Sequence, residues 1–151
     1  AGGHLASMLG TFRSDYARIG DALDAVSFYP DFMVLLSPVI MLSGGNIHKG
    51  SAINLLGEGY NIARADSFST QNRVTNLTPM TLLFHADDDT AVPSENSVVF
   101  YQACRQAGVP ASLHIFDQGG HKIALTHNPI TTDHWKALMS SWLIDNVVDA
   151  K

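Results

Sequence analysis

Short, wholly apolar runs alternate along the chain with stretches whose apolar residues recur at helical spacing. Phe32–Leu36 is apolar throughout and is followed closely by Pro38, which predicts a strand buried on both faces of a sheet. The apolar run over residues 80–84 predicts a second buried strand by the same reasoning. Partial alternation of apolar and polar residues predicts a third strand over residues 111–117.

Helical periodicity fills much of the sequence between these strands. Near the amino terminus, four apolar side chains recur at helical spacing and form one stripe: Leu5, Met8, Leu9 and Phe12. The predicted helices cover residues 3–12, 16–25, 51–56, 60–67, 94–108 and 133–147. Their predicted N-terminal caps include Asp15, Ser51 and Ser94. Residues 72–79 are predicted to be a connecting loop.

The alternation of strands and helices predicts an α/β fold with about three parallel strands and helices on both faces. Gly2 and Gly3 are predicted to let the first helix approach a neighbouring strand closely. With 151 residues, the chain is long enough for one domain with a sizeable core. In parallel sheets of this kind, ligands bind at the carboxyl ends of the strands.

Composition narrows the possible functions. Hydrophobic residues make up 46% of the chain and charged residues 15%, with a net charge of −5, which is typical of a globular protein. No cluster of lysine and arginine could follow a phosphate backbone, so we expect no nucleic-acid partner. No apolar run approaches the roughly 20 residues of a membrane span. Cys104 is the single cysteine and is predicted to lie in the core.

A carboxylate follows one predicted strand and a histidine follows the next. Asp89 comes shortly after the second strand, and His121 follows the third in a turn that begins Gly119-Gly120. The two residues are 121 − 89 = 32 positions apart, which is one helix plus one strand, so neighbouring strand ends can bring them together. A histidine base needs such a carboxylate to fix its tautomer and to stabilise the imidazolium. The pair fits the last two members of a serine–aspartate–histidine triad, in that order along the chain.

Three consecutive aspartates compete for the acid's role. Asp89 is preferred because it stands four residues before Pro93, at a fixed offset from the entry to the next helix. Asp87 and Asp88 are predicted to be turn residues that bind nearby backbone N–H groups. Two alternatives are a plain acidic turn and a calcium or magnesium site, although adjacent residues in one turn rarely all face one ion.

The remaining histidines are assigned other roles. His85 ends a buried strand and is predicted to be a structural group with satisfied hydrogen bonds. His4 is predicted to support the first helix by packing or hydrogen bonding. The others show no metal-ligand spacing and are interpreted as surface or helix-terminal residues: His48, His114, His127 and His134. We therefore expect no metal and no cofactor.

Longer stretches resemble the bacterial acetylxylan-esterase-like branch of the α/β-hydrolases. The similarity is carried by Pro30-Asp31-Phe32, Pro38-Val39-Ile40, His48-Lys49-Gly50-Ser51, Asn54-Leu55-Leu56-Gly57, Ser94-Glu95-Asn96-Ser97, Ala107-Gly108-Val109-Pro110-Ala111 and Gly119-Gly120-His121. The resemblance implies that Asp89 is the triad acid and His121 the base. It also implies that the nucleophilic serine directly precedes Ala1, whose N–H belongs to the oxyanion hole. Lys122-Ile123-Ala124-Leu125 departs from the glycine–aromatic pair expected after His121.

By this resemblance, the chain is the C-terminal part of a single α/β-hydrolase domain, over residues 1–151. The implied activity of the intact protein is serine-dependent hydrolysis of small acyl esters, including acetyl groups on xylan-type sugars. Alternatives are a peptidase or thioesterase on the same fold, or a non-catalytic binding module. The 151 residues alone are expected to be inactive, and the apolar edge around residues 33–36 is expected to promote self-association.

Overall fold

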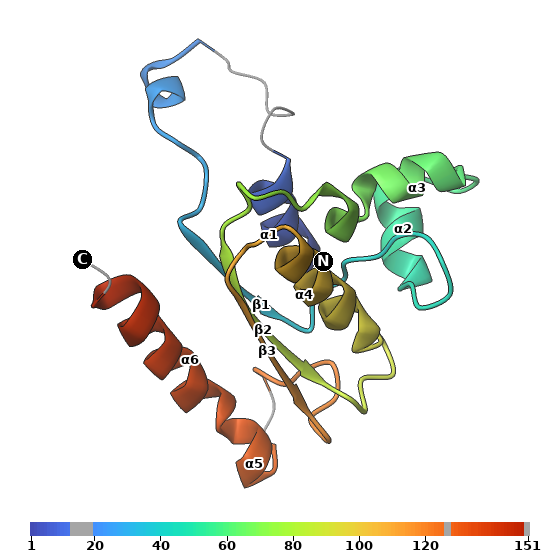
Figure 1. Ribbon diagram of the computed structural model, residues 1–151. Coiled ribbons are helices and arrows are strands. Elements are labelled where there is room, and N and C mark those ends of the chain that lie inside the picture. The colour runs from blue at the N-terminus through green and yellow to red at the C-terminus, as the bar shows by residue number, and fades with distance from the viewer. Residues whose placement is uncertain (13–19, 126–127, 150–151) are drawn as a thin grey trace.

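The computed structural model describes residues 1–12, 20–125 and 128–149. Its centre is a parallel three-stranded sheet in the order β1-β2-β3, formed by β1 (Phe32–Leu36), β2 (Met80–Ala86) and β3 (Ala111–Phe116) (Figure 1). All three predicted strands are present, and β2 continues two residues beyond its predicted end. The predicted α/β class and the parallel sheet are therefore confirmed.

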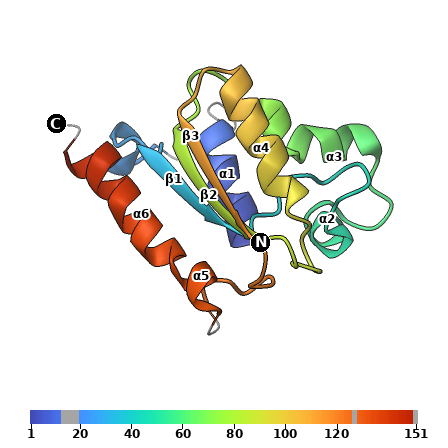
Figure 2. The same cartoon turned by 60° about the horizontal axis from the view of Figure 1, so that its bottom comes forward.

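Helices cover both faces of the sheet. α1 (Gly2–Thr11) and α4 (Glu95–Gln106) lie on one face, and α6 (Trp135–Leu143) lies on the other (Figures 1 and 2). A short π-helical segment, η3 (Ile144–Val148), continues directly from α6. In the described residues, no helix combines the length and apolarity needed to cross a lipid bilayer.

Smaller elements fill the connections, and here the predictions were less accurate. The segments are η1 (Ala22–Ala25), α2 (Lys49–Leu56), α3 (Ile62–Phe68), η2 (Thr70–Arg73) and α5 (Ile130–Asp133). Of the helix predicted over residues 16–25, residues 16–19 lie outside the described residues, residues 20 and 21 are not helical, and residues 22–25 form only a 3₁₀ turn. The loop predicted from residue 72 starts inside the 3₁₀ turn η2.

The cap predicted at Ser51 is wrong, Ser94 holds the predicted N-cap position without a side-chain bond, and the third, Asp15, lies outside the described residues. The imidazole of His48, not Ser51, caps α2 by accepting the N–H of Ser51 at 3.1 Å. Ser94 precedes α4 but makes no capping bond, because its hydroxyl donates to Asp87 at 3.2 Å. In both cases the capping bond expected from a serine side chain is absent. His48 takes that place at α2, and the Ser94 hydroxyl bonds Asp87 instead of an N–H of α4.

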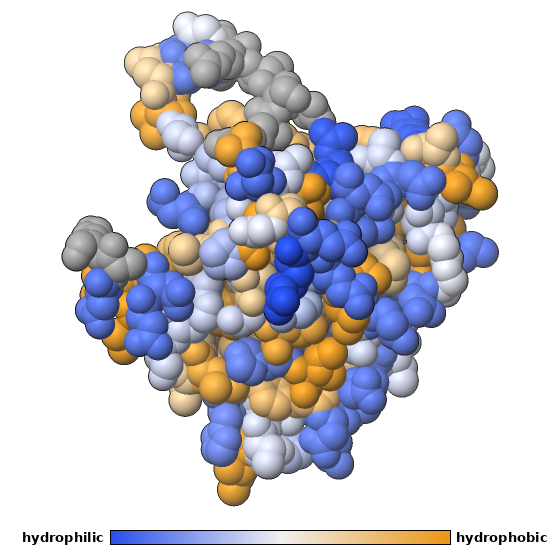
Figure 3. Space-filling view, in the orientation of Figure 1, coloured by the Kyte–Doolittle hydropathy of each residue, from blue (hydrophilic) through white to orange (hydrophobic). Residues whose placement is uncertain are grey.

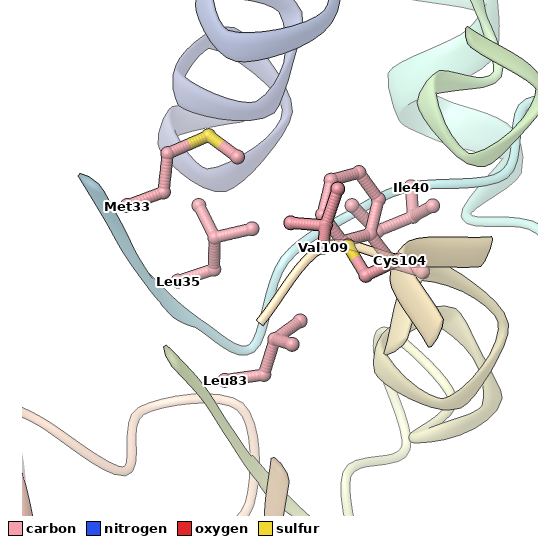
Figure 4. Close-up of a cluster of buried hydrophobic side chains, with 7 residues drawn as sticks. Met33, Leu35, Ile40, Leu83, Cys104 and Val109 are labelled. Atoms are coloured by element: carbon pink, nitrogen blue, oxygen red, sulfur yellow. The ribbon is translucent and has the colours of Figure 1, made fainter. Parts of the chain in front are cut away.

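The core on the α1 and α4 side is made by alternate residues of the strands. Met33 and Leu35 from β1 and Leu83 from β2 point toward these helices, as Figure 4 shows. Cys104 of α4 is fully buried in this cluster, and burial raises the pKa of its thiol to about 12. As predicted, this cysteine is part of the core.

The opposite face packs against α6 through aromatic side chains. Phe84 of β2 lies edge-on to Trp135, with ring centroids 6.0 Å apart. Leu82 and Ile123 complete this second cluster. Because β2 is central and both its faces are covered, its run of apolar residues is buried along nearly its whole length.

The start of α1 lies against the carboxyl end of β1. A Cβ atom on Gly3 would meet the backbone of Pro38 at 2.7 Å, so only glycine allows this approach, whereas Gly2 has open space around it. The prediction of close approach therefore holds for Gly3 alone. His4 is buried and bonds the carbonyl of Phe68 at 2.9 Å, which fixes α1 to α3 as its predicted supporting role required.

Self-association through β1 stays a prediction, which the sheet order makes testable. β1 pairs only with β2 in the described part of the chain. The N–H of Ser37 points to β2, so by strand alternation the N–H of Val34 faces the open edge. Apolar patches also interrupt the polar surface in Figure 3.

We expect the 151-residue chain to associate as its concentration rises, because an open strand edge offers unpaired backbone groups. Val34→Pro removes one outward N–H without breaking a bond to β2 and should shift the chain toward monomer. Light scattering coupled to size-exclusion chromatography measures both. A monomeric wild-type chain at high concentration would contradict the prediction.

Candidate active site

Asp89 lies in the turn that follows β2, with its side chain fully buried. Its Oδ1 atom accepts the backbone N–H groups of Ala91 and Val92, both at 2.9 Å. This local turn is typical of aspartate and leaves the other carboxylate oxygen pointing elsewhere. The sequence after β2 therefore sets the orientation of the carboxylate before any distant residue contacts it.

His121 supplies the distant partner. Its Nδ1 lies 2.9 Å from Oδ2 of Asp89, and because an ionised carboxylate only accepts, Nδ1 carries the proton. The turn before it requires left-handed backbone, with φ of +147° at Gly119 and +57° at Gly120. The His121 side chain is 42% exposed. One ring nitrogen is thus bound to the carboxylate, while the imidazole remains accessible from outside.

The surroundings keep Asp89 ionised. Burial by itself would raise the pKa of this carboxyl, but hydrogen bonds from the Val92 N–H, His121 and the Ala91 N–H outweigh it, so its pKa lies below the ordinary value of 3.8. A buried charge is tolerated here because its oxygens have donors. The anion is therefore present at neutral pH, ready to stabilise a positive charge on His121.

The two neighbouring aspartates have separate roles. Asp87 accepts the Ser94 hydroxyl at 3.2 Å, close to its predicted role in a local turn although the donor is a side chain. Asp88 differs from the prediction, because its Oδ1 accepts the N–H of Gly120 at 2.7 Å, 32 positions away. Asp88 and Asp89 therefore bind adjacent residues of the opposite loop, Gly120 and His121. Position next to Asp89 was the only signal in the sequence that could have suggested this.

A metal site is not supported by the arrangement. Within residues 1–12, 20–125 and 128–149, no three histidine, cysteine, aspartate or glutamate side chains converge on a point that could hold an ion. The three aspartates are directed at Ser94, Gly120 and His121 instead.

His85 is fully buried, with both ring nitrogens hydrogen bonded, as predicted. Nδ1 lies 2.7 Å from the Ser97 hydroxyl, and Nε2 lies 2.9 Å from the Val92 carbonyl. Burial lowers the pKa of His85 more than its bonds to Val92 and Asp89 raise it, so the ring is neutral at pH 7. Sequence reasoning missed that Nε2 also lies 3.3 Å from Oδ2 of Asp89. The spacing of four residues was the available signal.

The other histidines lie away from this pair or outside the described residues. His48 caps α2 and His134 stands at the start of α6, so both are helix-terminal as predicted. His114 is half-buried on β3 and stacks on Phe84 at 5.2 Å, so its interpretation as a surface or helix-terminal residue was wrong. Burial lowers the pKa of His114. His127 lies outside the described residues.

The third candidate, Ala1, lies at the same edge of the sheet. It immediately precedes α1, in which Gly3 lies against Pro38 just after the carboxyl end of β1. Ala1 borders a largely apolar cavity of about 280 Å³ between α1 and α2. The cavity is lined by Ala1, His4, Leu5, Met8, Leu42, Ser51, Asn54 and Leu55. Asp89 and His121 also follow carboxyl strand ends, so all three candidates share one edge.

Comparison with known proteins now assigns the family. Residues 50–149 match the prolyl oligopeptidase family, a stretch that includes both Asp89 and His121. The chain belongs to the prolyl oligopeptidase family. The expected resemblance to acetylxylan-esterase-like α/β-hydrolases is confirmed, because an acetylxylan esterase is among the proteins similar to this chain. The chain is 38% identical over 125 residues to an acetylxylan esterase of Xylanibacter ruminicola, covering 80% of this chain and 24% of that protein.

Solved structures agree with this assignment. The crystal structure of an acetyl ester-xyloside bifunctional hydrolase from Caldicellulosiruptor lactoaceticus superposes with a TM-score of 0.88 at 39% identity, over 96% of this chain and 53% of the other. A carboxylesterase of Lactobacillus plantarum superposes with a TM-score of 0.72 at 25% identity, over 97% of this chain and 56% of the other. This prolyl oligopeptidase family chain thus spans about half the length of these two solved structures.

The Asp88 contact predicts a local change that can be measured directly. Asp88→Ala removes the acceptor for the Gly120 N–H, so the Gly120 amide should exchange with solvent about tenfold to a hundredfold faster, as expected for loss of a hydrogen bond to a charged group. Hydrogen exchange followed by NMR provides the measurement. Asp87→Ala is the matched control, since Asp87 contacts Ser94 and not the turn, and it should leave Gly120 unchanged.

The lowered pKa of His85 predicts how stability varies with pH. Below pH 6.5 the unfolded chain protonates this histidine while the folded chain does not, so the free energy of unfolding falls as the pH drops through 6.5 and stops falling from this source below the folded pKa. His85→Gln should reduce that slope by at most about 1.4 kcal/mol per pH unit. Urea unfolding at several pH values tests this. Thr81→Val, which removes a buried hydroxyl without a titrating group, should keep the wild-type slope.

Proposed function

We propose that the protein containing this chain is a serine carboxylic-ester hydrolase, with Asp89 as the acid and His121 as the base of its triad. The observation that carries the proposal is the 2.9 Å bond between Asp89 Oδ2 and His121 Nδ1, made by two loops at the carboxyl edge of the sheet. A buried anion that fixes one nitrogen leaves the other, Nε2, to take a proton. The relatives with ester-hydrolase names support the same reaction class.

The nucleophile in this proposal is a serine directly before Ala1. Its oxygen attacks the ester carbonyl while Nε2 of His121 takes its proton, and Asp89 stabilises the resulting imidazolium. The backbone N–H of Ala1, at the start of α1, donates to the oxyanion. His121 then passes the proton to the departing alcohol. The acyl group is then bound to the serine oxygen. In the second step of the reaction, His121 takes a proton from a water molecule that attacks this acyl group, which releases the carboxylic acid and restores the serine.

The proposed substrates are acetyl esters, including those on xylan-type sugars. The cavity of about 280 Å³ that Ala1 borders has a largely apolar lining, which suits a small acyl group, and its lining includes the polar residues Ser51 and Asn54 but neither Asp89 nor His121. The names of two relatives point the same way, one an acetylxylan esterase and the other a hydrolase of acetyl esters and xylosides. No cofactor takes part in this proposal.

A peptidase is the second candidate, because residues 50–149 match a family whose description is prolyl oligopeptidase. The same acid and base serve ester and amide hydrolysis, so Asp89 and His121 do not discriminate between them. Comparing kcat/KM for an acetate ester with that for a proline-containing peptide amide decides the question. We favour ester hydrolysis, because the chain is 38% identical to an acetylxylan esterase over 125 residues.

The chain spans only part of the relatives it matches. We propose that residues 1–151 form the C-terminal part of one hydrolase domain, consistent with coverage of 53% of a solved relative. Among the described residues, none with a hydroxyl or thiol is hydrogen bonded to His121. From the resemblance to serine esterases, in which the nucleophile would precede Ala1, we expect no meaningful ester hydrolysis from these 151 residues by themselves.

Substitutions in the full-length protein test the proposal. His121→Ala and Asp89→Asn should each lower kcat/KM for p-nitrophenyl acetate by about a thousandfold or more, since both members of the pair act in the same step. Asp87→Asn is the control and should stay within about threefold of wild type, because Asp87 contacts Ser94 rather than His121. Ester turnover that survives His121→Ala would reject the assignment.

A further inference from the structure

The hydrogen bonds of His85 determine which of its nitrogens carries the proton. Nε2 lies 2.9 Å from the Val92 carbonyl and 3.3 Å from Oδ2 of Asp89, and both of these oxygens can only accept. Nε2 therefore carries the hydrogen. In the neutral ring Nδ1 is then an acceptor, and the Ser97 hydroxyl donates to it at 2.7 Å.

His85 thereby contacts the carboxylate of Asp89 along two routes. Its N–H is shared between the Val92 carbonyl and Oδ2, with the shorter distance to Val92. Val92 in turn donates its own N–H to Oδ1 of Asp89 at 2.9 Å. The imidazole of His85 thus lies 3.3 Å from Oδ2 and is hydrogen bonded to Val92, the residue whose N–H binds Oδ1.

We propose that His85 is a positioning residue that orients the Asp89 carboxylate toward His121 through its Nε2–H. The proposal rests on the proposed function, in which Asp89 and His121 are the acid and base. His85 itself is buried behind the carboxylate and does not touch substrate. It acts by fixing the plane of the carboxylate, so that Oδ2 stays aimed at Nδ1 of His121.

The physical reason is that Oδ2 otherwise has His121 as its one partner among the described side chains. His121 makes the shorter contact with Oδ2, but it is partly exposed and follows a glycine turn, whereas His85 is fully buried and fixed by its bonds to Ser97 and Val92. A fixed, neutral donor on the inner side restrains rotation without placing a second positive charge beside His121. Catalytic geometry is sensitive to small displacements, which gives such a restraint a measurable effect.

Two substitutions separate positioning from general packing. His85→Leu removes the donor, and His85→Gln restores an N–H near the position of Nε2. In the full-length protein we expect His85→Leu to lower kcat for p-nitrophenyl acetate about tenfold to a hundredfold with KM changed less than twofold. His85→Gln should recover kcat to within about threefold of wild type.

A matched control addresses loss of stability. Thr81 is buried on the same strand, β2, but its hydroxyl bonds the Pro79 carbonyl at the other end. Thr81→Val should lower the melting temperature while leaving kcat within about threefold. Equal losses of kcat in Thr81→Val and His85→Leu would show that packing, not positioning, is responsible, and would overturn the proposal.

A measurement on the wild-type protein needs no variant to fold. Nitrogen-15 NMR of labelled histidine should show His85 as the neutral Nε2–H tautomer at pH 7. An Nδ1–H tautomer or an imidazolium at His85 would overturn the proposal.

Failure of this inference is distinguishable from failure of the proposed function. If Asp89→Asn and His121→Ala abolish activity while His85→Leu retains wild-type kcat, the positioning role alone is rejected. If all three retain activity, the triad assignment is rejected as well.

Discussion

Folding places a negative charge out of contact with water at Asp89, and the edge of the sheet is organised around compensating it. Two backbone N–H groups of its own turn bind Oδ1, and two imidazoles approach Oδ2. Without these donors a buried carboxylate would take up a proton or destabilise the fold. The same donors also fix the orientation of the Asp89 carboxylate, because a carboxylate held at both oxygens cannot rotate. The bond to His121 is therefore as much a product of the inner partners as of the outer one.

The position of this charge follows from the sheet. β2 is the central strand, covered on one face by α1 and α4 and on the other by α6. The turn that carries Asp89 therefore begins at the end of a strand packed on both faces. β3 ends beside it in parallel register, with Ala86 opposite Phe116. Loops that leave two such neighbouring ends start a few ångströms apart. Asp88 and Asp89 can for this reason both reach residues that lie 32 positions further along the chain.

Much of this could be predicted from the sequence because the relevant signals are local. An apolar run over Phe32–Leu36 gives a strand whatever its partners, and a glycine pair before His121 gives a tight turn. Contacts between distant segments were missed. Apart from its position next to Asp89, Asp88 carries no signal that its partner is Gly120. Likewise, the general preference for serine as a cap does not reveal that the ring of His48 accepts the N–H of Ser51 at the start of α2. His114 was placed at the surface or a helix end because partial alternation in β3 does not reveal that Phe84 stacks on it.

The acid and the base both belong to one continuous β–α–β segment, from β2 through α4 to the turn after β3. A helix and a strand that neighbour each other in the chain lose little entropy in coming together, so this segment can assemble as a short-range folding unit. The contact between Asp89 and His121 is made within this segment, although β2 and α4 also pack against β1 and the residues that follow it. One stretch of neighbouring elements thus supplies both the buried carboxylate and the imidazole that it orients, so their relative position depends mainly on how β2 and β3 pair.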